Sequence, residues 1–215
     1  MRRALVVASL LAASLTGMLG VSSCAGGPAA ADWRPLFDGA SLADWEPTGF
    51  GGDGEVRIED GAIRMDMGSP LTGITRREGV PSGNYELRVV AARMLGNDFF
   101  CALTFPVGND HLTVVLGGWG GTVCGFSNLD GLDANHNGSR ALRSFETGRD
   151  YELVVRVDAD SVTATVDGTL LARTDRAGVR IGLRNEMLPC VPLSVSAFST
   201  EARVRSVAWR PLDAR

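Results

Sequence analysis

The residues of this 215-residue chain best suited to move protons near neutral pH are a histidine and its neighbouring carboxylates. His111 follows Asp110 where a hairpin is expected to turn, and Asp98 begins the neighbouring expected strand. Because the ordinary pKa of imidazole lies close to neutral pH, His111 is the best general-base candidate. Asp110 and Asp98 complete the set of candidate catalytic residues. The alternative is a turn aspartate beside a solvated histidine.

A tryptophan surrounded by glycines is the best candidate for contact with a ligand. Trp119 lies within Gly-Gly-Trp-Gly-Gly at 117–121, where the glycines leave its indole little local cover. Such a ring can stack on the apolar face of a sugar and keep its N–H free for a hydroxyl. The alternative is an indole folded back as a plug over the end of the domain. The other substrate-binding candidates follow an expected strand at 179–183, and their alternative is an ordinary surface loop: Arg184, Asn185 and Glu186.

A polar loop at 128–140 carries a pattern that resembles a metal site. Asp133, Asn135 and Asn137, followed by Gly138, match the first half of a calcium-binding loop. Ser144 stands where an EF-hand needs a bidentate glutamate, and no helix is expected on either side. The sequence therefore requires no cofactor and leaves calcium open, against a plain loop rich in Asx turns.

The composition excludes several classes of function. All 21 basic residues are arginines, which excludes a Schiff-base lysine and a phosphate-loop lysine. The chain is mildly acidic and its arginines are dispersed, so no nucleic-acid partner is expected.

Residues 1–23 have the pattern of a bacterial lipoprotein signal peptide. Arg2 and Arg3 precede an apolar segment too short for a comfortable membrane span, and the segment ends in a lipobox-like Val-Ser-Ser-Cys. In this interpretation Cys24 is lipidated and binds the membrane, 24–31 is a tether, and 32–215 is one domain in the cell envelope. Cleavage there would take the net charge from −4 to −6, because the removed segment has no acidic residue. The alternative is ordinary cleavage near 25–31, which would give a secreted protein.

Alternating apolar residues and turn signals about every 8–12 residues predict an all-β domain. Three sequential strands at 98–107, 111–118 and 121–127 are expected to form a central meander, covered on both faces. An Asp-Gly turn at 60–61 predicts a hairpin between 55–59 and 62–67. No helix of three turns is expected, and two antiparallel sheets in a jelly-roll sandwich are favoured. Further strands are expected at 33–37, 71–77, 84–93, 140–146, 151–158, 162–166, 170–174, 179–183, 193–199 and 203–210.

Three cysteines remain after Cys24. Cys101 and Cys124 lie on the first and third strands of the expected meander, which places them roughly 9–10 Å apart. This separation exceeds the Cα distance limit of about 7 Å for a disulfide, so the two are expected to be free buried thiols. The pairing of Cys190 is left open.

The opening segment WRPLFDGASLADW at 33–45 resembles the W-x-x-L-F-D-G-x-S-L-x-x-W motif of the 3-keto-disaccharide hydrolase family, also called domain of unknown function 1080. Four later segments are similar to the family in the same order: VRIEDGAI at 56–63, GNYELR at 83–88, VDG at 166–168 and VRSVAW at 204–209. The resemblance covers essentially all of 32–212. It implies a concanavalin A-like lectin/glucanase sandwich with activity or binding on sugars.

The resemblance also implies a reaction. Members of the family act on 3-keto-glycosides, in which the carbonyl acidifies the neighbouring C–H, so elimination and hydration need one base and one carbonyl polariser. Glucanases of this fold carry Glu-x-Asp-x-x-Glu on one strand, and its absence here argues against retaining glycosidase chemistry.

The expected function is that of an exported carbohydrate-active protein, a hydrolase or lyase of (3-keto-)glycosides. The alternative is a non-catalytic carbohydrate-binding or structural module on the cell surface. The hydrolase or lyase and the carbohydrate-binding module both have a glycan or small sugar as partner, and they differ in whether a base lies beside an arginine or a metal.

Overall fold

The computed structural model describes residues 32–212. The expected signal peptide, the tether at 24–31 and the expected lipidation site Cys24 lie outside the described residues. Within 32–212, no helix is long and apolar enough to cross a membrane.

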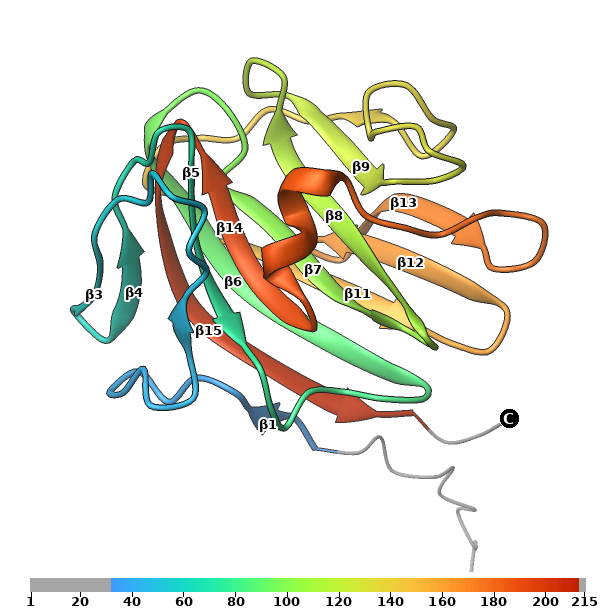
Figure 1. The fold of residues 1–215 in the computed structure, drawn as a ribbon, viewed down its shortest axis with the longest axis horizontal. Helices are drawn as coiled ribbons and strands as arrows, with labels where there is room; N and C mark the ends of the chain where they lie inside the picture. Colours follow the sequence, from blue (N-terminus) through green and yellow to red (C-terminus); the bar gives the residue numbers. More distant parts are fainter. Residues whose placement is uncertain (1–31, 213–215) are drawn as a thin grey trace, which may run out of the picture.

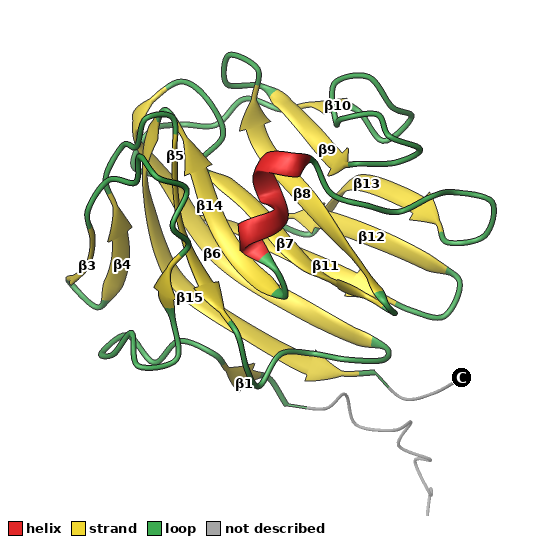
Figure 2. Cartoon of the chain, viewed as in Figure 1, coloured by secondary structure: helices red, strands yellow, loops and turns green. Residues whose placement is uncertain are grey.

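The described chain folds into two antiparallel sheets packed face to face (Figure 1, Figure 2). The eight-stranded sheet has the order β13-β12-β11-β6-β15-β4-β3, with β1 also paired to β15. The seven-stranded sheet has the order β10-β9-β8-β7-β14-β5-β2. The predicted all-β, two-sheet jelly-roll sandwich is confirmed.

The strands of the eight-stranded sheet are β1 (Arg34–Pro35), β3 (Val56–Glu59), β4 (Ala62–Met65), β6 (Tyr85–Gly96), β11 (Tyr151–Val157), β12 (Ser161–Val166), β13 (Thr169–Asp175) and β15 (Thr200–Pro211). Those of the seven-stranded sheet are β2 (Glu46–Pro47), β5 (Leu71–Arg76), β7 (Cys101–Val107), β8 (Asp110–Gly118), β9 (Val123–Ser127), β10 (Ala141–Leu142) and β14 (Leu193–Phe198). One 3-10 helix, η1 (Asn185–Cys190), precedes β14.

Alternate residues along each strand point inward and form the core between the two sheets. Successive side chains of a strand point to opposite faces, so every second residue of β6 is directed inward. Tyr85, Leu87, Val89 and Ala91 of β6 are each at most 1% exposed. The inward-facing residues of β14 meet them from the other sheet: Leu193, Val195 and Ala197.

The predicted meander is confirmed as β7-β8-β9. Cys101 pairs with Leu116 of β8, and Cys124 lies one strand further, on β9. Cys101, Cys124 and Cys190 are buried and free, as expected for the first two. The Asp-Gly hairpin is also confirmed, since Asp60 (φ 51°) and Gly61 (φ 71°) both adopt the left-handed conformation that joins β3 to β4.

Three expected strands differ in the structure. The expected strand at 33–37 is limited to the two residues of β1. Residues 179–183 form a loop with a single bridge from Ile181 to Leu129, because this segment pairs only with the polar loop and not with a sheet. The expected strand at 140–146 is limited to the two residues of β10.

The outer face of the seven-stranded sheet is partly covered by η1, which lies across β14, β7 and β8 in Figure 2. Met187 and Cys190 of η1 pack on Ala102 and Val115 to form a second, small core. The part of this face that η1 leaves uncovered holds the site described next.

Candidate functional site

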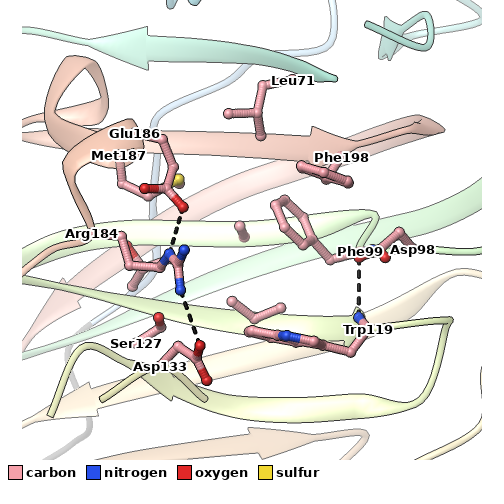
Figure 3. A pocket seen from close by; sticks show the side chains of 13 residues that line it. Leu71, Asp98, Phe99, Trp119, Ser127, Asp133, Arg184, Glu186, Met187 and Phe198 are labelled. Carbon is pink, nitrogen blue, oxygen red and sulfur yellow. Dashed lines mark hydrogen bonds and ion pairs between the residues drawn. The ribbon is translucent and has the colours of Figure 1, made fainter. Parts of the chain in front are cut away.

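A pocket of about 310 Å³ opens on the outer face of the seven-stranded sheet, beside η1 (Figure 3). It combines an apolar floor, an aromatic wall and a charged rim. Its lining residues come from β5, β7, β8, β9, β14, η1 and four loops: Leu71, Asp98, Phe99, Ala102, Thr113, Val115, Trp119, Ser127, Asp133, Arg184, Glu186, Met187 and Phe198.

The floor consists of the residues that alternate with core residues on β7, β8 and β9. Thr113 and Val115 alternate with the core residues Leu112 and Val114, and Ser127 follows the core residue Phe126. Ser127 is only 3% exposed, and its hydroxyl has no hydrogen-bond partner among the described residues. An unpaired buried hydroxyl that lines a pocket is well placed to bond a polar ligand.

The wall of the pocket is aromatic. Trp119 is 40% exposed, and the rings of Phe99 and Phe198 pack with centroids 5.5 Å apart (Figure 3). The chain is irregular before β7, so Phe100 enters the core beside Cys101 and Phe99 lines the pocket. The pocket therefore offers an indole face and edge to a flat ligand.

The carboxylate of Asp98 binds backbone N–H groups of the loop that carries Trp119. It accepts hydrogen bonds from the N–H of Phe99 (2.8 Å), Trp119 (3.2 Å) and Gly120 (3.3 Å). Trp119 itself has a left-handed backbone (φ 49°), which is uncommon outside glycine and needs such support. Asp98 lies in the pocket, but both of its carboxylate oxygens are engaged by the loop.

The guanidinium of Arg93 binds backbone carbonyls of the same loop. One nitrogen of this buried guanidinium donates to the carbonyls of Asp98 (3.2 Å), Gly117 (3.1 Å) and Gly121 (3.1 Å). Burial lowers the pKa of Arg93, although the nearby Asp98 charge opposes the shift. A Cβ on Gly117 would lie 2.4 Å from this guanidinium, so the loop needs glycine there.

Sequence reasoning overlooked Arg93, but the signal for it was present. The inward-facing residues of β6 alternate from Tyr85 to Ala91, and position 93 continues that series. An arginine at an inward-facing position must find several acceptors, because a buried charge without partners is strongly unfavourable.

The charged rim is a chain of ion pairs centred on Arg184. Arg184 donates from Nη1 to Oδ2 of Asp133 (3.0 Å) and from Nε to Oε1 of Glu186 (2.5 Å), as Figure 3 shows. The other oxygen of Asp133 accepts from the N–H of Asn135 (3.0 Å) and lies 2.7 Å from Nδ1 of His136. The structure thus brings together residues predicted separately as substrate-binding and as metal-binding.

A second hollow of about 340 Å³ borders this chain of ion pairs. It shares Asp133, Arg184 and Glu186 with the first pocket. The rest of its lining comes mainly from the polar loop and the start of η1: Asn128, Gly131, Leu132, His136, Leu183 and Asn185.

The predicted calcium residues do not fit a calcium ion in this arrangement. The amide of Asn137 donates to the carbonyls of Phe126, Leu132 and Asp133, while its oxygen accepts from the N–H and hydroxyl of Ser139. The carboxylate of Asp133 is paired with Arg184. Over residues 32–212, no three side chains of His, Cys, Asp or Glu are grouped as metal ligands.

The three candidate catalytic residues do not lie together. Asp110 and His111 pair with Val107 and Pro106 at one end of the β7–β8 hairpin, whereas Asp98 precedes the other end. At a rise of about 3.3 Å per residue, this separates Asp98 from His111 by roughly 25–30 Å. Partial burial lowers the pKa of His111 against the opposing Asp110 charge, but neither residue lines the pocket. A catalytic role for any of the three stays a prediction.

No family model and no curated protein matches the chain. Solved structures with the same fold do exist, at low sequence identity. The exoplasmic/lumenal domain of VIP36 in its Ca²⁺/Man3GlcNAc-bound form matches with a TM-score of 0.59 and 15% identity, over 86% of this chain and 92% of that one. Carbohydrate-binding module CBM66 from Bacillus subtilis matches with a TM-score of 0.54 and 10% identity, over 83% and 99%. The endo-β-1,3(4)-glucanase SCLam of family GH16 matches with a TM-score of 0.50 and 12% identity, over 85% and 96%.

These similarities identify the fold class. The chain has the concanavalin A-like and galectin-like sandwich that lectins, carbohydrate-binding modules and glucanases share. At 10–15% identity they show the fold alone, and the resemblance to 3-keto-disaccharide hydrolases rests on the sequence motifs.

Proposed function

We propose that this chain is a carbohydrate-binding protein and that the pocket beside Trp119 holds a neutral sugar. The observation that carries the proposal is an indole held at a pocket wall, opposite a chain of charged hydrogen-bonding groups. A sugar ring presents an apolar face and a polar edge of hydroxyls, and this pocket offers a matching surface for each. The solved structures of similar fold include proteins described as bound to mannose glycans or as a carbohydrate-binding module.

The rim charges favour a neutral sugar over an acidic one. Asp98, Asp133 and Glu186 contribute three carboxylates, against the single guanidinium of Arg184. Because Arg184 is already paired with two of them, an added carboxylate or phosphate would meet net repulsion. Sugar hydroxyls can instead donate to the carboxylates and accept from Arg184 and Ser127.

The direct test is binding of purified protein to a panel of neutral and acidic glycans. The stacked indole is expected to contribute about 1–2 kcal/mol, so Trp119→Ala should weaken binding of the best glycan roughly tenfold. Leu142→Ala, a second exposed apolar residue at 62% exposure, is the matched control and should leave affinity unchanged. A Trp119→Ala protein that melts early but binds normally would make Trp119 a packing residue and contradict the proposal.

An enzyme acting on 3-keto-glycosides, as the sequence motifs imply, is the second candidate. One observation favours it: Asp133 lies 2.7 Å from the His136 ring and 3.0 Å from Arg184, so an imidazole is held beside a guanidinium. The side chain of His136 is 62% exposed and could serve as the base, with Arg184 polarising the sugar carbonyl.

Incubation with 3-keto-disaccharides and their unoxidised parents tests this candidate. Monosaccharide release from the keto sugars alone, lost in His136→Ala and kept in His111→Ala, would establish the activity. Binding without release would leave the carbohydrate-binding function.

The proposal extends to the location of the protein. We place the mature chain in the cell envelope, anchored by lipid on Cys24, on the strength of the lipobox-like sequence. Cys24→Ser should release the protein from membranes. A variant that still partitions with membranes would make this localisation wrong.

Calcium is a separate question within the proposed function, because one similar structure is described as bound to Ca²⁺. Since the oxygens of Asp133 and Asn137 are engaged within the protein, EDTA is expected to leave glycan affinity unchanged. Loss of binding on chelation, restored by added calcium chloride, would establish a calcium site.

A further inference from the structure

The two hollows share one set of lining side chains. The Trp119 pocket has a volume of about 310 Å³, and the hollow beside His136 about 340 Å³. Each is near the lower end of the roughly 300–1,000 Å³ typical of ligand sites. Asp133, Arg184 and Glu186 line both, so a ligand that crosses this rim would occupy both hollows.

The two hollows differ in chemistry. The first has an aromatic wall formed by Phe99, Trp119 and Phe198, whereas the second has no aromatic ring other than the imidazole of His136. Its polar groups include the side-chain amides of Asn128 and Asn185, which can both donate and accept hydrogen bonds. The first hollow therefore suits ring stacking, and the second suits a hydroxyl-rich group without a stacked face.

The shared side chains can themselves contact a ligand. Arg184 uses Nη1 and Nε in its two ion pairs, and a guanidinium has five N–H donors in all. Its side chain is 41% exposed and that of Glu186 is 45% exposed. A linkage oxygen or hydroxyl placed over the rim could thus accept from Arg184 without breaking either ion pair.

We propose that the two hollows are adjoining subsites of one groove that takes a neutral oligosaccharide of at least two residues. One ring stacks on Trp119, the next lies beside His136 and Asn185, and Arg184 contacts the segment between them. This inference rests on the proposed carbohydrate-binding function, and it adds the length of the ligand and the residues of the second subsite.

Calorimetry with matched monosaccharides and oligosaccharides tests the second subsite. The probes are glucose, mannose and galactose, each with its disaccharide and trisaccharide in several linkages. The wild-type protein should bind the preferred disaccharide about tenfold more tightly than its monosaccharide. The double variant His136→Ala/Asn185→Ala should reduce this ratio to about one and leave monosaccharide affinity unchanged. Trp119→Ala should weaken both ligands.

Asn109→Ala is the matched control, because Asn109 is an exposed asparagine that lines neither hollow. It should keep the wild-type ratio, and thermal melting should be similar for all variants, since His136 and Asn185 are exposed. A disaccharide preference that survives the double variant, or a wild-type ratio near one, would overturn the second subsite while the Trp119 pocket stands. No binding of any probe by the wild type would contradict the proposed function itself.

Discussion

At the scale of single residues, two oppositely charged side chains set the position of Trp119. Asp98 accepts from the N–H groups of the loop, and Arg93 donates to its carbonyls. The position of the indole therefore depends on two residues, and neither of them needs to touch a ligand. Side chains of this kind are positioning residues, and they give predictions distinct from those of a catalytic group.

Replacing Arg93 by methionine should lower the free energy of unfolding by about 3 kcal/mol, because three carbonyls around it would lose their donor. Urea unfolding of the two proteins measures this difference. Arg173→Met is the matched control, since Arg173 has a 55% exposed side chain and a single exposed ion pair, and it should change stability by less than about 0.5 kcal/mol. Equal stability of the Arg93 and Arg173 variants would contradict the assigned role.

Asp98→Ala should weaken glycan binding about as much as Trp119→Ala, roughly tenfold, because the loop would lose the acceptor for its N–H groups. Asp98→Asn keeps one acceptor oxygen and should retain a larger share of the affinity. Calorimetry on the two variants tests this order. If the asparagine variant binds glycan normally but loses a hydrolytic activity, Asp98 is a catalytic residue instead.

At the scale of elements, η1 forms one side of the pocket and is held by a small core. Met187 is 5% exposed and packs with Ala102, Val115 and Cys190, whereas its neighbour Leu188 is 58% exposed. The helix has two turns at most, and its position depends on this packing.

Met187→Ala should therefore lower the free energy of unfolding by about 2–3 kcal/mol, at the low end of the range for buried methionine because the cluster is small. Leu188→Ala, one residue along the same helix, should cost less than about 0.5 kcal/mol. Denaturant unfolding of this pair is the measurement. A larger loss in Leu188→Ala than in Met187→Ala would show that η1 packs differently.

The sequence could predict most of the sheets and only parts of the site. Period-two alternation and the Asp60–Gly61 turn are local signals, and they correctly predict β3, β4 and β6 to β9. The ion pair between Asp133 and Arg184 joins two loops 51 residues apart, and no local pattern encodes that distance. Residues 179–183 have the apolar alternation of a strand, but they lack a sheet edge to pair with.

At the scale of the whole molecule, the sheet that faces away from the pocket carries arginine–carboxylate pairs. Asp150, in the loop before β11, accepts from Arg203 and Arg205 of β15, each at 2.8 Å. Partial burial alone would raise the pKa of Asp150, but these hydrogen bonds and charges outweigh it and lower the pKa below its ordinary value of 3.8. Because the folded-state pKa is lowered, the stabilisation is present above the unfolded-state pKa and is lost as pH falls through the folded-state pKa.

Asp150→Asn should accordingly be less stable than the wild type at pH 7, by about 1 kcal/mol or less for a partly exposed network. The difference should begin to shrink below about pH 4, where the carboxylate of the unfolded chain takes up a proton, and should vanish once the pH has fallen below the lowered pKa of the folded carboxylate. Unfolding measured at pH 7 and at acidic pH tests the sign. A difference that grows on acidification would contradict it.

The central claim is that a sugar binds against the indole of Trp119, and NMR of the indole N–H groups tests it most directly. The chain has four tryptophans, and Trp119→Phe identifies the relevant signal. Trp45 is an internal control, because its indole N–H donates to the carbonyl of Leu36 and its ring is 6% exposed. Titration with the preferred glycan should shift the Trp119 signal in proportion to binding and leave the Trp45 signal in place. A glycan that binds by calorimetry while the Trp119 signal stays unmoved would contradict the account.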